Sequence, residues 1–189
     1  MGPHEPKKVM KCPLRLVVWV SLLVLSCVIA ALPHAHAGAD NEATLSVLLS
    51  SDKKEYSLKE EIRWDARLLN SGTAPLTVFG HLRWGYGAGL TIHISDSAGQ
   101  DVPPKYLDDD MILPTEADDR CSYVVLPPGH YLGATRPDHV SNLVQKPGTY
   151  FVYVEYKIPL PKKYGKGPNF WSREKPAVVS NRVEIDVRN

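Results

Sequence analysis

The sequence predicts an all-β domain, a sandwich of about seven or eight antiparallel strands preceded by an N-terminal signal helix. Three observations support this fold class. From residue 43 onward, apolar and polar residues alternate with a period of two in short segments, turn-forming residues separate the segments, and no long stretch has the helical period. Short strands without amphipathic helices favour two packed antiparallel sheets.

The N-terminus has the layout of a secretory signal. Four basic residues precede an apolar run over residues 16–32, which is followed by Pro33 and the small residues Ala35 and Ala37. Basic, apolar and small residues in this order are typical of a cleavable signal peptide. We therefore predict that residues 1–37 are a signal peptide. The alternative is an uncleaved membrane anchor formed by residues 16–32, because a run of this length is at the short limit for a bilayer span of roughly 30 Å.

The first half of the remaining chain contains four predicted strands. Residues 43–50 and 62–68 alternate apolar with polar residues, and Trp64 in the second segment is the predicted core aromatic. Residues 76–79 are rich in β-favouring side chains, and residues 90–94 alternate again. These segments are expected to contribute strands to both sheets.

The second half begins with an interruption. Residues 101–120 carry three prolines and no sustained period, which indicates a long irregular connection. Strand patterns return at 121–126 and 130–135, and a short helical turn is expected within 138–145.

Two further strands complete the prediction. Residues 149–158 place Tyr150 and the alternate residues after it on one face, and residues 179–187 alternate in the same way. The segment between them, residues 159–176, is rich in Lys, Gly and Pro and is predicted to be a loop.

Short motifs at the ends of these strands carry a family resemblance. They are Lys-Glu-Tyr-Ser-Leu-Lys-Glu at 54–60, Leu-Asn-Ser-Gly at 69–72, Leu-Pro-Pro-Gly at 126–129, Pro-Gly-Thr-Tyr at 147–150 and Val-Ser-Asn-Arg-Val-Glu-Ile-Asp-Val at 179–187. Together they resemble bacterial extracytoplasmic immunoglobulin-like domains. The resemblance implies a single immunoglobulin-like domain over residues 38–189. It also implies a corner in which the Tyr150 hydroxyl bonds to nearby backbone.

Removal of the predicted signal changes both charge and cysteine content. The whole chain has 22 basic and 21 acidic residues, whereas the chain after residue 37 keeps 18 basic and 20 acidic residues. A weakly acidic domain lacks the positive field that nucleic acid requires, so we exclude nucleic acid as a partner. Cys121 remains as the single cysteine, which rules out an internal disulfide, and we expect it to be a small buried residue.

Acidic residues of the 101–120 segment are the candidate metal ligands. Carboxylate oxygens are the ligands that Ca²⁺ prefers, but the spacing matches no EF-hand loop, and a solvated acidic loop is the competing interpretation. The histidines after residue 37 show no paired spacing, so we expect no zinc or copper site, and His93 is predicted to lie on the surface. The candidate calcium ligands are Asp108, Asp109, Asp110, Asp118 and Asp119.

No residue pattern indicates catalysis. The sequence lacks a Gly-x-Ser-x-Gly motif, and no histidine is close to Cys121 in the sequence. We therefore predict a non-enzymatic protein without catalytic residues or a cofactor.

Two loops rich in glycine and aromatic residues, 80–89 and 164–171, are the candidate recognition surfaces. Aromatic and arginine side chains anchor interfaces because they bury a large area for little lost entropy. The competing interpretation is that the tryptophans cover the open ends of the core. The candidate binding residues are Arg83, Trp84, Tyr86, Tyr164, Phe170 and Trp171.

These observations predict a secreted or periplasmic immunoglobulin-like module that binds another envelope or extracellular protein, or a glycan, through its end loops. The alternative is a protease inhibitor, because some small bacterial inhibitor families also resemble such sandwiches. Contact with a membrane is expected only through residues 16–32, if the signal is retained.

Overall fold

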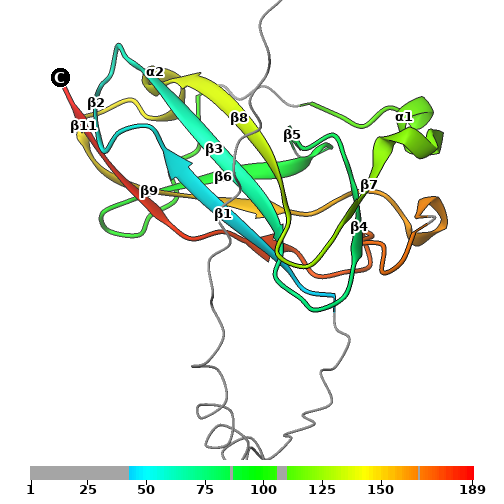
Figure 1. The fold of residues 1–189 in the computed structure, drawn as a ribbon. Coiled ribbons are helices and arrows are strands. Elements are labelled where there is room, and N and C mark those ends of the chain that lie inside the picture. Colours follow the sequence, from blue (N-terminus) through cyan, green and yellow to red (C-terminus); the bar gives the residue numbers. More distant parts are fainter. Residues whose placement is uncertain (1–42, 86, 106–109, 166) are drawn as a thin grey trace, which may run out of the picture. The chain divides into compact units, whose positions relative to one another are not determined.

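A computed structural model describes residues 43–85, 87–105, 110–165 and 167–189 (Figure 1). They belong to one compact unit, Ala39–Asn189. The predicted signal peptide lies outside the described residues. In the described part of the chain, every helix is too short or too polar to cross a membrane.

The described residues form eleven strands and four short helical segments. In chain order they are β1 (Leu45–Ser51), β2 (Glu55–Ser57), β3 (Glu61–Asn70), β4 (Leu76–Phe79), β5 (Arg83–Trp84), β6 (Gly89–Asp96), α1 (Pro114–Asp118), η2 (Arg120–Ser122), β7 (Tyr123–Leu126), β8 (Tyr131–His139), α2 (Val140–Leu143), β9 (Gly148–Tyr156), η3 (Lys162–Tyr164), β10 (Val178–Val179) and β11 (Val183–Arg188).

The strands form an immunoglobulin-like β-sandwich (Figure 1). One sheet has the order β1-β3-β8, and the other has the order β2-β11-β9-β6-β5, with β10 added to β9. The start of the chain contributes to both sheets, because β1 pairs antiparallel with β3 whereas β2 pairs parallel with the last strand, β11. A separate two-stranded sheet, β4-β7, lies beside the sandwich.

The core confirms the alternation predicted from the sequence. Leu45, Val47 and Leu49 of β1 are buried, and Trp64 of β3 has no exposed surface. These side chains belong to one apolar cluster with the inward residues of β9 and β11. Because the described cysteine forms no disulfide, this cluster is the main source of stability.

Tyr150 forms the corner that the resemblance implied. Its ring is buried in β9, and its hydroxyl donates a hydrogen bond to the Lys146 carbonyl oxygen at 2.8 Å. The bond fixes the entry of the chain into β9.

Asn70, at the end of β3, organises the neighbouring turns. It is fully buried, and its Nδ2 donates to the carbonyl oxygens of Ala74 at 2.9 Å and Leu126 at 2.8 Å. Its Oδ1 accepts from the Gly72 N–H at 3.1 Å. One side chain therefore ties the end of β3 to both β7 and the turn before β4.

Residues just before β11 join the two sheets. The side chain of Asn181 pairs with the backbone of Leu49 in β1, accepting from its N–H at 2.8 Å and donating to its carbonyl oxygen at 2.9 Å. The neighbouring Ser180 Oγ accepts from the Val154 N–H of β9 at 3.0 Å. The polar pair Ser180-Asn181 thus connects one edge of the first sheet to the second sheet.

Two expectations for single residues are wrong. Cys121 is exposed in η2 rather than buried in a strand, because β7 begins two residues later. His93 is half-buried rather than on the open surface, because its ring stacks on Tyr153 with centroids 4.8 Å apart and planes 8° apart. The 101–120 connection also contains the short helix α1, and the short strands β2 and β5 were not predicted.

Candidate functional site

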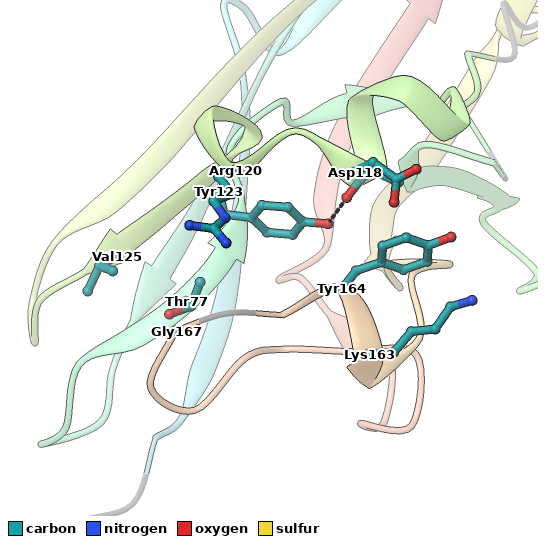
Figure 2. A pocket seen from close by; sticks show the side chains of 9 residues that line it. Thr77, Asp118, Arg120, Tyr123, Val125, Lys163, Tyr164 and Gly167 are labelled. Atoms are coloured by element: carbon teal, nitrogen blue, oxygen red, sulfur yellow. Dashed lines mark hydrogen bonds between the residues drawn. The ribbon is translucent and has the colours of Figure 1, made fainter.

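An open cleft of about 750 Å³ lies where the β4-β7 sheet meets the segments that carry α1, η2 and η3 (Figure 2). Its lining combines charged, aromatic and aliphatic side chains from three distant parts of the sequence. The lining residues are Thr77, Ala117, Asp118, Arg120, Tyr123, Val125, Lys163, Tyr164 and Gly167.

The floor of the cleft is one face of the β4-β7 sheet. Thr77 of β4 pairs with Val125 of β7, and Tyr123 lies two residues away on the same face. The loop between β9 and β10, which carries η3, is called the η3 loop. The Thr77 hydroxyl donates to the Pro168 carbonyl oxygen at 2.9 Å, and this bond holds the η3 loop against β4. The floor therefore positions one wall directly.

Tyr123 is held on three sides. Its hydroxyl donates to the Ala117 carbonyl oxygen at 2.6 Å, the bond drawn in Figure 2. Its ring meets Phe79 and Phe170 edge to face, with centroids 5.7 Å and 5.5 Å apart. Burial raises the pKa of Tyr123, and the charge of Asp118 adds to this effect. A tyrosine hydroxyl is protonated at neutral pH in any case, and the raised pKa extends to higher pH the range in which this bond holds α1 in place.

Three exposed charges line the cleft without ion-pair partners among the described residues: Asp118, Arg120 and Lys163. Lys163 Nζ lies 5.0 Å from the centre of the Tyr164 ring, a cation-π contact. Because no described residue neutralises them, these charges can pair with a ligand.

Glycine at position 167 allows the η3 loop to lie close to β4. A Cβ atom at this position would be 2.0 Å from Thr77 Oγ1, far inside van der Waals contact. At Gly165, a Cβ atom would be 2.0 Å from Cδ1 of Phe170. The glycines of this loop therefore set the shape of one wall of the cleft.

The predicted binding tryptophans and Phe170 are core residues. Trp84 and Trp171 are each 6% exposed, and Phe170 is 8% exposed. These three side chains offer almost no surface to a partner. For the two tryptophans, this burial agrees with the competing interpretation from the sequence, in which they cover the open ends of the core. Tyr86 lies outside the described residues.

The other two predicted binding residues have different surroundings. Tyr164 lines the cleft. Arg83 instead forms an ion pair with Glu116 of α1, with Nη1 3.2 Å from Oε2. Glu116 also accepts from the Leu113 N–H at 2.9 Å, and this backbone bond, followed by Arg83, lowers the pKa of the Glu116 carboxyl. Arg83 thus fastens α1, which forms part of the cleft wall.

The predicted calcium ligands are dispersed where they are described. Asp118 lines the cleft, Asp110 is exposed, and Asp119 caps η2 by accepting from the Cys121 N–H at 2.9 Å. In the described segments, no three His, Cys, Asp or Glu side chains come together around a metal position. Asp108 and Asp109 lie outside those segments, so calcium binding stays a prediction.

Sequence reasoning missed most of the cleft. The sequence predicts Arg120 in an irregular connection and Thr77 and Tyr123 in two strands, with no sign that the three residues meet. One signal was present: the 159–176 loop is rich in lysine, whereas the 101–120 segment is rich in aspartate. Because opposite charges attract, these two loops could be expected to lie close together in one small domain.

Comparison with known proteins gives a likeness to solved structures. No protein-family model and no curated protein matches the chain. A β-glucosidase from Listeria innocua in complex with gluconolactone is 16% identical, with a TM-score of 0.38, over 78% of this chain and 16% of that chain. The CARDB domain of a Pyrococcus furiosus protein, in complex with di-metal ions, is 10% identical, with a TM-score of 0.38, over 78% of this chain and 94% of that chain. The likeness concerns the fold alone.

A β-glucosidase from Erythrobacter marinus gives a similar result. It is 12% identical, with a TM-score of 0.35, over 77% of this chain and 16% of that chain. This chain thus spans 16% of the length of these glucosidases.

Proposed function

We propose that this immunoglobulin-like protein is an exported, non-enzymatic module that binds another envelope or extracellular protein, or a glycan, in the cleft over β4 and β7. The observation that carries the proposal is the set of charges, Asp118, Arg120 and Lys163, that have no ion-pair partner among the described residues and line the same cleft as the fixed ring of Tyr123. Rigid aromatic surface and unpaired charge are the features from which interfaces gain affinity and specificity.

The chemistry of the lining supports binding rather than catalysis. The Tyr123 hydroxyl is already bonded to a backbone carbonyl, and the Thr77 hydroxyl is bonded to Pro168. Among the described hydrogen bonds, neither hydroxyl donates to a side-chain base, the arrangement that activates a nucleophile.

A capture experiment tests the binding role. The full chain is expressed with its own N-terminus, and envelope extracts and glycan arrays are probed with the wild type, Tyr164→Ala and Lys163→Glu. Matched controls are Tyr131→Ala, which truncates an exposed tyrosine of β8, and Lys59→Glu, which reverses an exposed charge outside the cleft. We expect the two cleft variants to lose a partner that both controls keep. Identical partners for all variants would remove the cleft from the function.

Export is tested separately. Cell fractionation followed by N-terminal sequencing is expected to recover a chain that begins at Gly38 outside the cytoplasm. A membrane-bound chain with an intact N-terminus would support the anchor at residues 16–32, and a cytoplasmic chain would refute export.

A further inference from the structure

The outer edge of β7 lies beside the cleft and carries backbone groups that point away from β4. On the other side of the small sheet, Thr77 of β4 donates its N–H to the Pro168 carbonyl oxygen at 3.1 Å, and its carbonyl oxygen accepts from the Trp171 N–H at 2.9 Å. Both backbone groups of Thr77 therefore point away from β7. Opposed residues of an antiparallel pair share this orientation, so Val125, which pairs with Thr77, directs its N–H and carbonyl away from β4.

Within the described chain this edge is open at Val125, whereas the N–H of Tyr123 already donates to the Arg120 carbonyl oxygen. Outside the β4-β7 ladder, no hydrogen bond among the described residues involves the backbone of Val125. The Val125 side chain is 49% exposed and lines the cleft. The edge is also short, because the next residue after β7, Pro127, has no N–H to donate to an added strand.

Charge near the start of β7 favours an acidic ligand. Arg120 lies three residues before Tyr123, is exposed, and has no ion-pair partner among the described residues. Figure 2 draws its guanidinium on the side of the Tyr123 ring away from the hydroxyl, whereas Asp118 is drawn on the hydroxyl side. A guanidinium binds a carboxylate through two parallel hydrogen bonds, so an acidic side chain in this part of the cleft finds a geometrically matched partner.

We propose that an extended peptide segment of a partner protein adds as a strand to the edge of β7 at Val125, beside the cleft, and places a Glu or Asp carboxylate against Arg120. This inference rests on the proposed binding function and names the class of ligand. Strand addition uses the main-chain N–H and carbonyl groups that a peptide repeats along its length and a glycan lacks.

Synthetic peptides test the proposal with the full chain. The reference probe is a short extended peptide of alternating Val and Thr with one central Glu. One comparison peptide carries Lys in place of Glu, and another keeps Glu but is N-methylated at alternate backbone positions. Fluorescence anisotropy is expected to show binding of the reference peptide, and at least about tenfold weaker binding of both comparison peptides.

Protein variants separate the backbone contact from the charge contact. Val125→Pro removes the outward N–H and is expected to abolish peptide binding with little change in the thermal midpoint, because the ladder to β4 does not use that group. Val124→Pro removes an N–H that points toward β4, and should lower the midpoint clearly. Arg120→Glu is expected to reverse the preference from the Glu peptide to the Lys peptide, whereas Lys59→Glu leaves the preference unchanged.

The outcomes are distinguishable from those of the proposed function. The inference is overturned if the Glu peptide does not bind at millimolar concentration, if N-methylation has no effect, or if Val125→Pro binds as well as the wild type. If these peptides do not bind but a glycan or folded protein is still captured by the wild type and not by Tyr164→Ala, the proposed binding function is supported and strand addition is refuted.

Discussion

Asn70 is predicted to be a main determinant of stability outside the apolar core. Asn70→Ala leaves the buried carbonyls of Ala74 and Leu126, and the half-buried N–H of Gly72, without their side-chain partner. An unsatisfied buried polar group costs about 1–3 kcal/mol, although the Leu126 carbonyl keeps a second lone pair and water reaches Gly72. We expect a loss of about 2–4 kcal/mol in the free energy of unfolding. In a domain of this size, that loss lowers the thermal midpoint by about 5–15 °C.

Asn70→Asp tests the same contacts with almost no change in shape. The introduced carboxylate accepts from Gly72 but, when ionised, cannot donate to the two carbonyl oxygens that face it. Burial and these oxygens raise the pKa of that carboxyl in the folded state above its unfolded value of about 3.9. The variant is therefore most stable in acid, where the carboxyl is protonated in both states, and loses stability as the pH rises through the folded pKa.

Urea unfolding followed by circular dichroism between pH 4 and pH 8 measures both effects. Asn142, half-buried in α2 with no side-chain hydrogen bond among those described, provides matched controls, Asn142→Ala and Asn142→Asp, with expected changes within about 0.5 kcal/mol. If Asn70→Ala costs no more than Asn142→Ala, or if Asn70→Asp gains stability with rising pH, this account of Asn70 is refuted.

Three further predictions concern the cleft and its surroundings. Gly167→Ala is expected to shift the η3 loop, to lower the free energy of unfolding by about 1–3 kcal/mol and to weaken partner binding. Adding Thr77→Ala, which removes the clashing hydroxyl, should restore part of this stability, as measured by thermal unfolding. Tyr123→Phe keeps the ring but loses the hydrogen bond to Ala117, so we expect the free energy of unfolding to fall by about 0.5–1.5 kcal/mol and proteolysis at α1 to become faster. Unchanged proteolysis would contradict the role of this bond. Thiol titration of the folded protein should find one reactive thiol, Cys121, per exported chain, and a buried, unreactive thiol would refute its exposure.

The parts of the fold predicted from the sequence are those fixed by burial of one strand face. A period of two marks such a face directly, which explains the success for β1, β3, β9 and β11 and for Trp64. The corner at Tyr150, which the family resemblance implied, is confirmed. It could be anticipated because the hydrogen bond joins residues only four positions apart in the sequence.

The cleft was beyond such reasoning. Its floor depends on the pairing of β4 with β7, which lie more than 40 residues apart, and no local period specifies that partnership. Aromatic residues in irregular segments present a second difficulty. Trp84 and Phe170 lie in segments without periodicity, so the sequence does not tell whether they face the core or solvent, and both turn inward.

The pairing of Asn181 with Leu49 also has a consequence for solubility. β1 is an edge strand, and its outward Leu48 is 48% exposed, a combination that invites another chain to dock. At Leu49, however, a side-chain amide already occupies both backbone groups that an incoming strand would need. The Asn181 amide thus obstructs strand addition in the middle of this edge, and Asn181→Ala would free both Leu49 backbone groups.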